Sequence, residues 1–208
     1  MQTVLNRVTL RGRVETCPVL SHSSHGVTYF CFSLAVKRLS GVEDVIPILV
    51  SETILFGHPC QKGQPLTVEG SLRSFNNRSG IGSRLVITVQ AKELSEGYEP
   101  DDNQVRLSGV LCKLPVYRKT PLGREICDLI LAVNRSYGRA DYLPCIAWSA
   151  EARRCASCGI GDRLILEGRI QSRGYIKNMD GLQVQKTAFE VSVSQVLEEE
   201  SAGANQKG

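Results

Sequence analysis

The sequence predicts an all-β protein made of two tandem copies of one small barrel. The first observation is an internal repeat: residues 6–12 return as residues 103–109, and residues 32–38 return as residues 129–135, both at an offset of 97. This spacing exceeds the roughly 20–50 residues of a solenoid repeat and fits a duplicated domain of about 100 residues. The second observation is that each copy contains short runs of alternating apolar and polar residues, as half-buried strands require.

Five strands are expected in each copy, separated by turn-forming pairs such as His25-Gly26 and Ser79-Gly80. In the first copy the expected strands are residues 4–14, 29–38, 45–50, 65–75 and 84–94. In the second copy they are residues 103–112, 125–135, 142–148, 162–173 and 185–197. Gly12 and Gly109 lie inside the first strand of each copy, where a closed barrel needs a sharp bend or bulge.

A short helix is expected between the third and fourth strands. In the second copy residues 149–159 are rich in alanine and arginine, and Ser149 can cap the start of a helix that Gly159 ends. In the first copy Pro59 would stop any helix in the equivalent segment, residues 51–57. Three strands, a short helix and two further strands is the element order of an OB-fold barrel.

The chain therefore divides into two OB-folds with a connecting segment and a tail. Residues 1–96 form the first OB-fold, a divergent copy with fewer aromatic residues, and residues 103–197 form the second, which is aromatic-rich and basic. Residues 97–102 are an acidic linker, and the small polar residues 198–208 are expected to be a disordered tail. The second copy carries 14 basic and 8 acidic residues, an excess that fits a polyanionic partner.

Composition and motifs argue against several classes of protein. No apolar run reaches the roughly 18 residues of a membrane span, and the N-terminus lacks the apolar core of a signal peptide, so we expect a cytoplasmic protein with no membrane partner. The eight cysteines are then expected to be free thiols, and Cys155 and Cys158 lack the second ligand pair of a zinc site. We find no nucleotide-binding loop, metalloprotease motif or nucleophile elbow, so neither an enzyme nor a cofactor is expected.

The second copy carries one pattern over its whole length. It consists of Asn, Val, Leu and Gly at alternate positions in 103–109, Leu-Ala-Val-Asn-Arg at 131–135, Pro-Cys-Ile-Ala-Trp at 144–148 and Glu-Gly-Arg-Ile at 167–170. This pattern resembles the bacterial single-stranded DNA-binding protein family, in a form with two OB-folds per chain. The first copy carries the same pattern at fewer positions.

The resemblance implies that bases stack on aromatic side chains at four places in the barrel. In the second copy these places hold Tyr137, Tyr142, Trp148 and Tyr175. By the repeat offset the first copy has Ser40, Val45, Ser51 and Asn77 there, and Phe75, two residues before Asn77, is its one expected stacking residue. Stacking of a base on an aromatic ring stabilises binding by roughly 1–3 kcal/mol and tolerates any base sequence.

Lysine and arginine side chains beside these rings would neutralise phosphates. In the second copy the expected phosphate-binding residues are Arg118, Lys119, Arg124, Arg135, Arg139, Arg169, Arg173 and Lys177. In the first copy they are Arg11, Lys37, Arg38 and Arg73.

The function implied is sequence-tolerant binding of single-stranded DNA in replication, recombination or repair. The resemblance also implies a homodimer with four barrels and, as possible partners, replication proteins. The family's acidic, hydrophobic tail tip is missing from residues 198–208, which makes recruitment by that route doubtful. The alternative is an OB-fold accessory or primosome-type protein of a plasmid, phage or mobile element that binds partner proteins or RNA.

Overall fold

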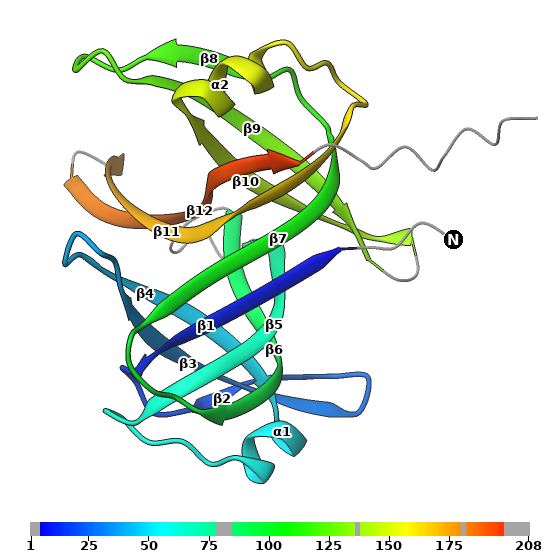
Figure 1. The fold of residues 1–208 in the computed structure, drawn as a ribbon. Coiled ribbons are helices and arrows are strands. Elements are labelled where there is room, and N and C mark those ends of the chain that lie inside the picture. Colours follow the sequence, from blue (N-terminus) through cyan, green and yellow to red (C-terminus); the bar gives the residue numbers. More distant parts are fainter. Residues whose placement is uncertain (1–4, 78–84, 136–137, 180–181, 198–208) are drawn as a thin grey trace, which may run out of the picture.

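The computed structural model describes residues 5–77, 85–135, 138–179 and 182–197, and these form two barrels joined side by side (Figure 1). The first barrel contains β1 (Asn6–Val14), β2 (Val19–Ser24), β3 (Val27–Lys37), β4 (Glu43–Ser51), α1 (Glu52–Gly57), β5 (Pro65–Asn76) and β6 (Leu85–Glu96). The second contains β7 (Asp102–Leu111), β8 (Val116–Lys119), β9 (Glu125–Asn134), β10 (Ala140–Trp148), α2 (Ser149–Ala156), β11 (Arg163–Met179) and β12 (Leu182–Leu197). The prediction of tandem OB-folds is confirmed.

All ten expected strands are present, but two strands were not predicted. β2 and β8 each pair with the strand that follows them and form a hairpin arm on each barrel. Their side chains are almost all exposed, so they lack the alternation of a half-buried strand. The β2–β3 turn uses His25 and Gly26, both with positive φ, as a two-residue hairpin requires.

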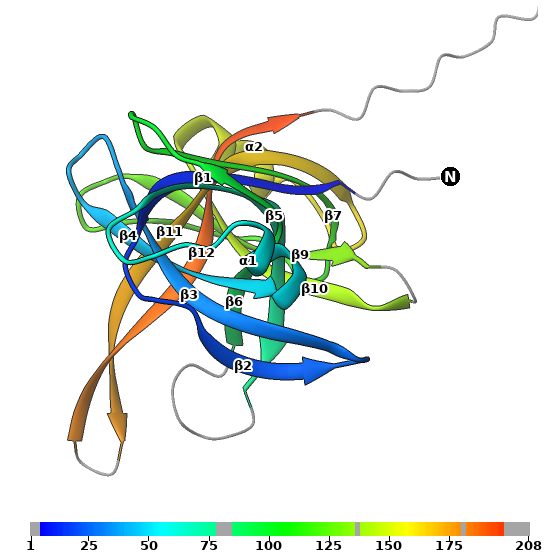
Figure 2. The same cartoon turned by 90° about the horizontal axis from the view of Figure 1, so that it is seen from below.

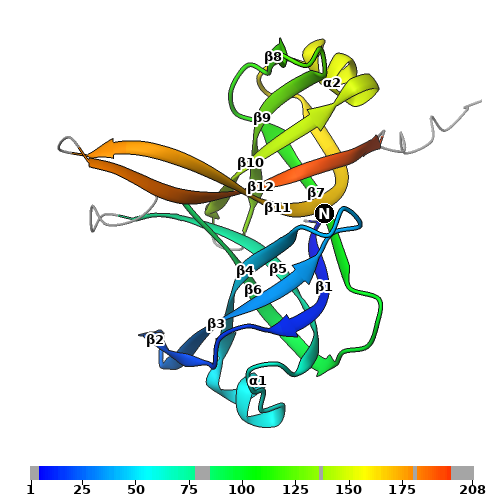
Figure 3. The same cartoon turned by 90° about the vertical axis from the view of Figure 1, so that its left-hand side faces the viewer.

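The hairpin of β11 and β12 is longer than predicted. The expected strands ended at residue 173 and resumed at 185, whereas β11 runs to Met179 and β12 starts at Leu182. Beyond Ser172 these strands pair with each other along the described register and extend away from the barrel (Figure 3). Few residues in this arm are buried, so the sequence carries little of the core pattern there.

The two helices differ in how they start. Ser51 caps α1, where its Oγ accepts a hydrogen bond from the Ile54 amide at 3.4 Å, and α1 ends at Gly57, before Pro59. The predicted cap of α2 is wrong: Trp148 occupies the N-cap position without a side-chain bond, and Ser149 is already the first helical residue. Trp148 stands one repeat after Ser51, so the position that would hold the cap holds an aromatic ring instead. The predicted end at Gly159 is also late, because α2 ends at Ala156.

The first strands of the two barrels hold them together. β1 and β7 pair antiparallel from Asn6 opposite Leu107 to Arg11 opposite Asp102, and they cross the middle of the molecule side by side (Figure 1). Gly12 allows β1 to pass over β3, because a Cβ there would lie 2.1 Å from the Ala35 carbonyl oxygen. Within the described residues, no helix has the length and apolar character needed to cross a bilayer.

Candidate nucleic-acid interface

Two of the predicted stacking residues lie on the outer face of β10. The inward positions of this strand include Asp141, Leu143 and Cys145, which are buried, whereas Tyr142 is 52% exposed. Trp148 lies on the same side because strand residues an even number apart share a face. Its ring is partly buried, and Nε1 donates a hydrogen bond to Ser192 Oγ at 3.1 Å.

The spacing of these two rings is compatible with an extended strand of nucleic acid. Six residues of β-strand separate Tyr142 from Trp148 by about 20 Å at roughly 3.3 Å per residue. The Trp148 ring is held in one orientation by its hydrogen bond, while the Tyr142 ring is open to solvent. The strand thus presents two separated aromatic surfaces.

Tyr175 lies on the β11–β12 arm, opposite Lys186, and its side chain is partly exposed. Ile176 beside it is 66% exposed, so the arm carries apolar as well as aromatic surface. Phe75, near the end of β5, is 51% exposed. Tyr137 lies outside the described residues.

Most of the predicted phosphate-binding residues of the second barrel are at the surface. Arg118, Lys119 and Arg124 lie on β8 and the turn after it, and all three are exposed. Arg118 forms an exposed ion pair with Asp128 at 2.8 Å. Arg139 is exposed before β10, and Arg169 and Arg173 lie on β11, the latter 3.7 Å from Glu190. Lys177 is on the arm, but its side chain lies outside the described set.

Three of the arginines that were predicted to bind phosphate instead contact buried carboxylates between the barrels. Arg135 donates to Asp141 through Nε at 2.6 Å and through Nη2, and Arg73 lies 3.1 Å from the same carboxylate. Arg38 donates to Asp44 at 2.6 Å and 2.5 Å. Both carboxylates are fully buried.

These contacts repeat across the junction between the barrels. Asp44 of the first barrel accepts hydrogen bonds from the Ser172 amide and hydroxyl of the second, at 2.6 Å and 2.8 Å. Asp141 of the second barrel accepts one from the Ser74 amide of the first at 2.5 Å. Burial alone would raise the pKa of Asp44, but the bonds from Arg38 and Ser172 outweigh it and hold the pKa below its ordinary value. The two sites therefore fix the barrels relative to each other.

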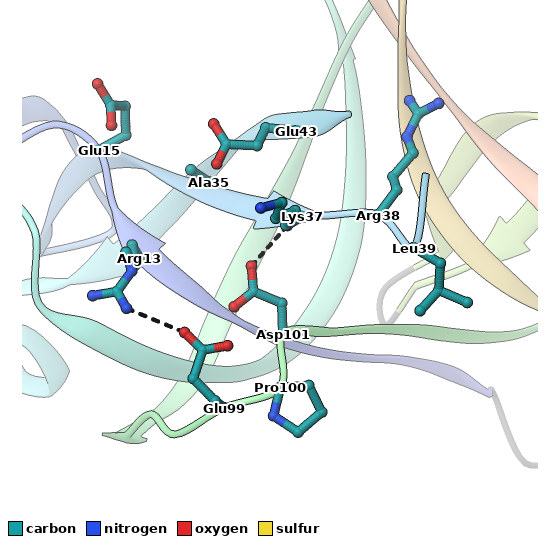
Figure 4. A pocket seen from close by; sticks show the side chains of 10 residues that line it. All are labelled: Arg13, Glu15, Ala35, Lys37, Arg38, Leu39, Glu43, Glu99, Pro100 and Asp101. Atoms are coloured by element: carbon teal, nitrogen blue, oxygen red, sulfur yellow. Dashed lines mark hydrogen bonds and ion pairs between the residues drawn. The ribbon is translucent and has the colours of Figure 1, made fainter. Parts of the chain in front are cut away.

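The acidic linker covers another part of the predicted basic surface (Figure 4). The Arg11 guanidinium lies 4.1 Å from the centre of the Tyr98 ring, and its Nε donates to the Pro100 carbonyl at 2.7 Å. The carboxylate of Asp101 accepts from the Lys37 backbone amide at 2.7 Å. Glu99 pairs with Arg13 at 3.1 Å. Composition marks this segment as acidic, but the side chains it contacts are distant in sequence.

The fold and this surface define a class of protein: tandem OB-folds that expose aromatic and cationic side chains. The model of the single-strand binding protein family matches residues 102–197. The single-stranded DNA-binding protein of Bacillus cereus is 34% identical over 113 residues, which cover 51% of this chain and 66% of that protein. Single-stranded DNA-binding protein B of Bacillus subtilis is 39% identical over 92 residues, 41% of this chain and 80% of its own length.

A solved structure matches both barrels. The crystal structure of the wild-type single-stranded DNA-binding protein from Thermus aquaticus superposes with a TM-score of 0.73 and 26% identity, covering 98% of this chain and 97% of that one. The chain therefore belongs to the single-strand binding protein family. It spans slightly less than two thirds of the length of the Bacillus cereus relative, at 66%.

Proposed function

We propose that this protein binds single-stranded DNA without strong sequence preference, by stacking bases on the second barrel and neutralising the phosphates between them. The observation that carries the proposal is the placement of Tyr142 and Trp148 on one outer face of β10, in a chain whose relatives are named for single-stranded DNA binding. Stacking needs only the face of a base, which every base has, so the binding tolerates sequence. Tyr137, Tyr175 and, on the first barrel, Phe75 complete the proposed stacking set.

The proposed phosphate-binding residues with exposed side chains are Arg118, Lys119, Arg124, Arg139 and Arg173 of the second barrel and Lys37 of the first. Arg169, which is half-buried, and Lys177 on the β11–β12 arm complete the proposed set. Arg38, Arg73 and Arg135 contribute first to the junction between the barrels, and Arg11 to the linker. Each phosphate neutralised on a single strand contributes about 0.7 to the slope of log affinity against log salt. A strong salt dependence is therefore part of the proposal.

The remaining elements of the proposal concern assembly and setting. We propose that two chains pair to give four barrels, that the protein acts in the bacterial cytoplasm in replication, recombination or repair, and that replication proteins are among its partners. Its role is to bind DNA without cleaving it. Mass measurement of the protein with and without a dT oligonucleotide tests assembly and binding together, and incubation of that DNA with magnesium tests for cleavage.

The sharpest test of the stacking surface is Tyr142→Ala. This ring is half exposed, so its removal should leave the fold intact while weakening oligo-dT binding about 5- to 150-fold, the equivalent of 1–3 kcal/mol. Phe56→Ala is the matched control, because Phe56 is 67% exposed but lies on α1 of the first barrel. Equal affinities of the two variants at low and high salt would overturn the stacking assignment. Preference for RNA over single-stranded DNA would instead favour the accessory or primosome-type function.

A further inference from the structure

An exposed apolar patch lies beside α1, at the end of the first barrel that is remote from the second barrel (Figure 1, Figure 3). Leu20 on β2 lies opposite Phe30 on β3, so both side chains point to the same face of the arm. The Phe56 ring of α1 lies 6.4 Å from the Phe30 ring, measured between their centroids. Leu20 and Phe56 are each 67% exposed, and Phe30 is partly buried. We call these three side chains the α1 patch.

The second barrel closes the corresponding surface with polar groups. One repeat after Leu20, Phe30 and Phe56 stand Tyr117, Cys127 and Arg153. Cys127 is fully buried. The Tyr117 hydroxyl donates a hydrogen bond to the Glu125 carboxylate at 2.7 Å, and Arg153 forms an ion pair with the same carboxylate.

The α1 patch therefore follows from the sequence of the first barrel and is not a requirement of the fold. Thr28 stands where the second barrel has Glu125, so the first barrel lacks the carboxylate that organises the polar surface. Single exposed apolar residues are ordinary, but contiguous ones mark sites where another molecule binds. The contacts from Leu20 through Phe30 to Phe56 are contiguous in this sense.

The surroundings of the α1 patch carry a single charge. Residues 16–36, which contain the β2–β3 arm, include no Asp, Glu, Lys or Arg, whereas the corresponding residues 113–133 include six. The one charged residue of α1 is Glu52, four residues before Phe56. Residues at this spacing share a helix face, with Cβ atoms about 5–6 Å apart. Within the described part of the chain the Glu52 carboxylate has no ion pair.

This charge decides between two kinds of occupant. If two copies of the chain met at the α1 patch, the Glu52 carboxylates would approach each other, and residues 16–36 and 53–61 supply no Lys or Arg to offset the repulsion. A segment of another protein that carries apolar side chains and a Lys or Arg matches both the apolar surface and the carboxylate. Because the chain has a net charge of +4, such a segment is attracted to Glu52 and not to the protein as a whole.

We infer that the α1 patch docks a basic amphipathic segment of a partner protein, with the apolar side chains of the segment against Leu20 and Phe56 and a Lys or Arg beside Glu52. The inference rests on the proposed function for the existence of protein partners, and it locates them on the first barrel. Tyr142 and Trp148 lie on β10 of the second barrel, so a partner at the remote α1 does not compete with DNA bound there.

The test uses the full chain and a synthetic probe. The probe is a fluorescein-labelled helical peptide of Leu, Ala and Lys in which each Lys stands one helical turn from a Leu, and fluorescence anisotropy measures its affinity. Phe56→Ala and Leu20→Ala should each weaken binding at least about fivefold, as truncation of an apolar anchor does. Leu122→Ala is the control, because Leu122 is 85% exposed but lies in the β8–β9 turn of the second barrel.

The role of the charge is tested with a second peptide in which Gln replaces every Lys. Wild-type protein should bind the Lys peptide up to about fivefold more tightly than the Gln peptide, the range of an exposed ion pair. Glu52→Gln should bind the two peptides equally. Phe56→Ala and Glu52→Gln should both bind oligo-dT as the wild-type protein does, because α1 is remote from the proposed stacking surface.

The outcomes separate this inference from the proposed function. If wild-type protein does not bind the Lys peptide, or if Phe56→Ala and Leu122→Ala bind it equally well, the inference is overturned. If Phe56→Ala converts paired chains into single chains in sedimentation, the α1 patch joins two copies, and the inference is again overturned. Failure of the wild-type protein to bind oligo-dT would contradict the proposed function and leave the peptide result standing.

Discussion

The buried carboxylate at the junction of the barrels gives the most quantitative prediction. Asp141 accepts bonds from Arg135, Arg73 and the Ser74 amide, and none of its side chain is exposed. Asp141→Asn keeps the shape but removes the charge, which leaves two guanidinium groups without their anion. Breaking a buried ion pair in this way costs about 3–5 kcal/mol of unfolding free energy.

The lower end of that range applies here, because both arginines are about a quarter exposed and can turn toward water. We therefore expect Asp141→Asn to lower the unfolding free energy by about 3 kcal/mol, or Tm by roughly 6–12 °C for a chain of this size. The loss in unfolding free energy is measured by urea titration, with circular dichroism and Trp148 fluorescence as the two signals. Glu69→Gln is the control, since its pair with Arg7 is exposed and should be worth less than about 0.5 kcal/mol. A loss below about 1 kcal/mol for Asp141→Asn would refute the structural role of this site.

Three further predictions concern single groups. Ser51→Ala should lower the unfolding free energy by about 1 kcal/mol, because it removes the side-chain cap of α1. Ser149→Ala should be nearly neutral, because Ser149 does not cap α2. Thermal unfolding of the two variants measures the difference. The folded-state pKa of Asp44 lies below its unfolded value, so its contribution is complete above about pH 4 and is lost as pH falls through the folded pKa. Wild-type stability should therefore fall more steeply with acid than that of Asp44→Asn. Replacing Lys119 and Arg124 by Gln should lower the salt slope of DNA binding by up to about 1.4 without changing urea stability.

The fold was largely predictable because both the repeat and the alternation of buried apolar positions can be recognised in the sequence. Leu34 and Leu131 are fully buried one repeat apart, and strands with such residues alternate visibly. The side chains of β2 and β8 are almost all exposed, so these strands show no apolar–polar alternation in the sequence, although they form the arms of both barrels. The misplaced cap has a similar cause, since the sequence shows a serine near the helix start but not which residue ends β10.

The candidate site was only partly predictable, because a positive charge in the sequence does not reveal its partner. Arg135 lies near Tyr137 in sequence, which suggests phosphate binding, yet it contacts Asp141 and the carbonyl of Ser74, 61 residues away. Pairings over such distances depend on how the barrels dock. Tyr142 was assigned from the family resemblance, and strand alternation gives the physical reason for its exposure, since it lies on the face of β10 that points away from the buried Asp141 and Leu143.

The linker determines which cations of the first barrel remain for DNA. Glu99 pairs with Arg13 and Asp101 accepts from the Lys37 backbone amide (Figure 4), while the Pro100 carbonyl accepts from Arg11, so a strand of DNA would have to break these contacts to engage Arg13 and Arg11. In Figure 2 the β2–β3 arm and the β11–β12 arm diverge, the first to the right and the second to the lower left, whereas in Figure 3 both point left. Arg73 and Arg135 lie at the junction between the barrels, so a strand that leaves the second barrel there would meet positive charge without competing with the linker. A linker variant in which Glu99 and Asp101 become Gln and Asn should therefore change oligo-dT affinity much less than Arg73→Gln does.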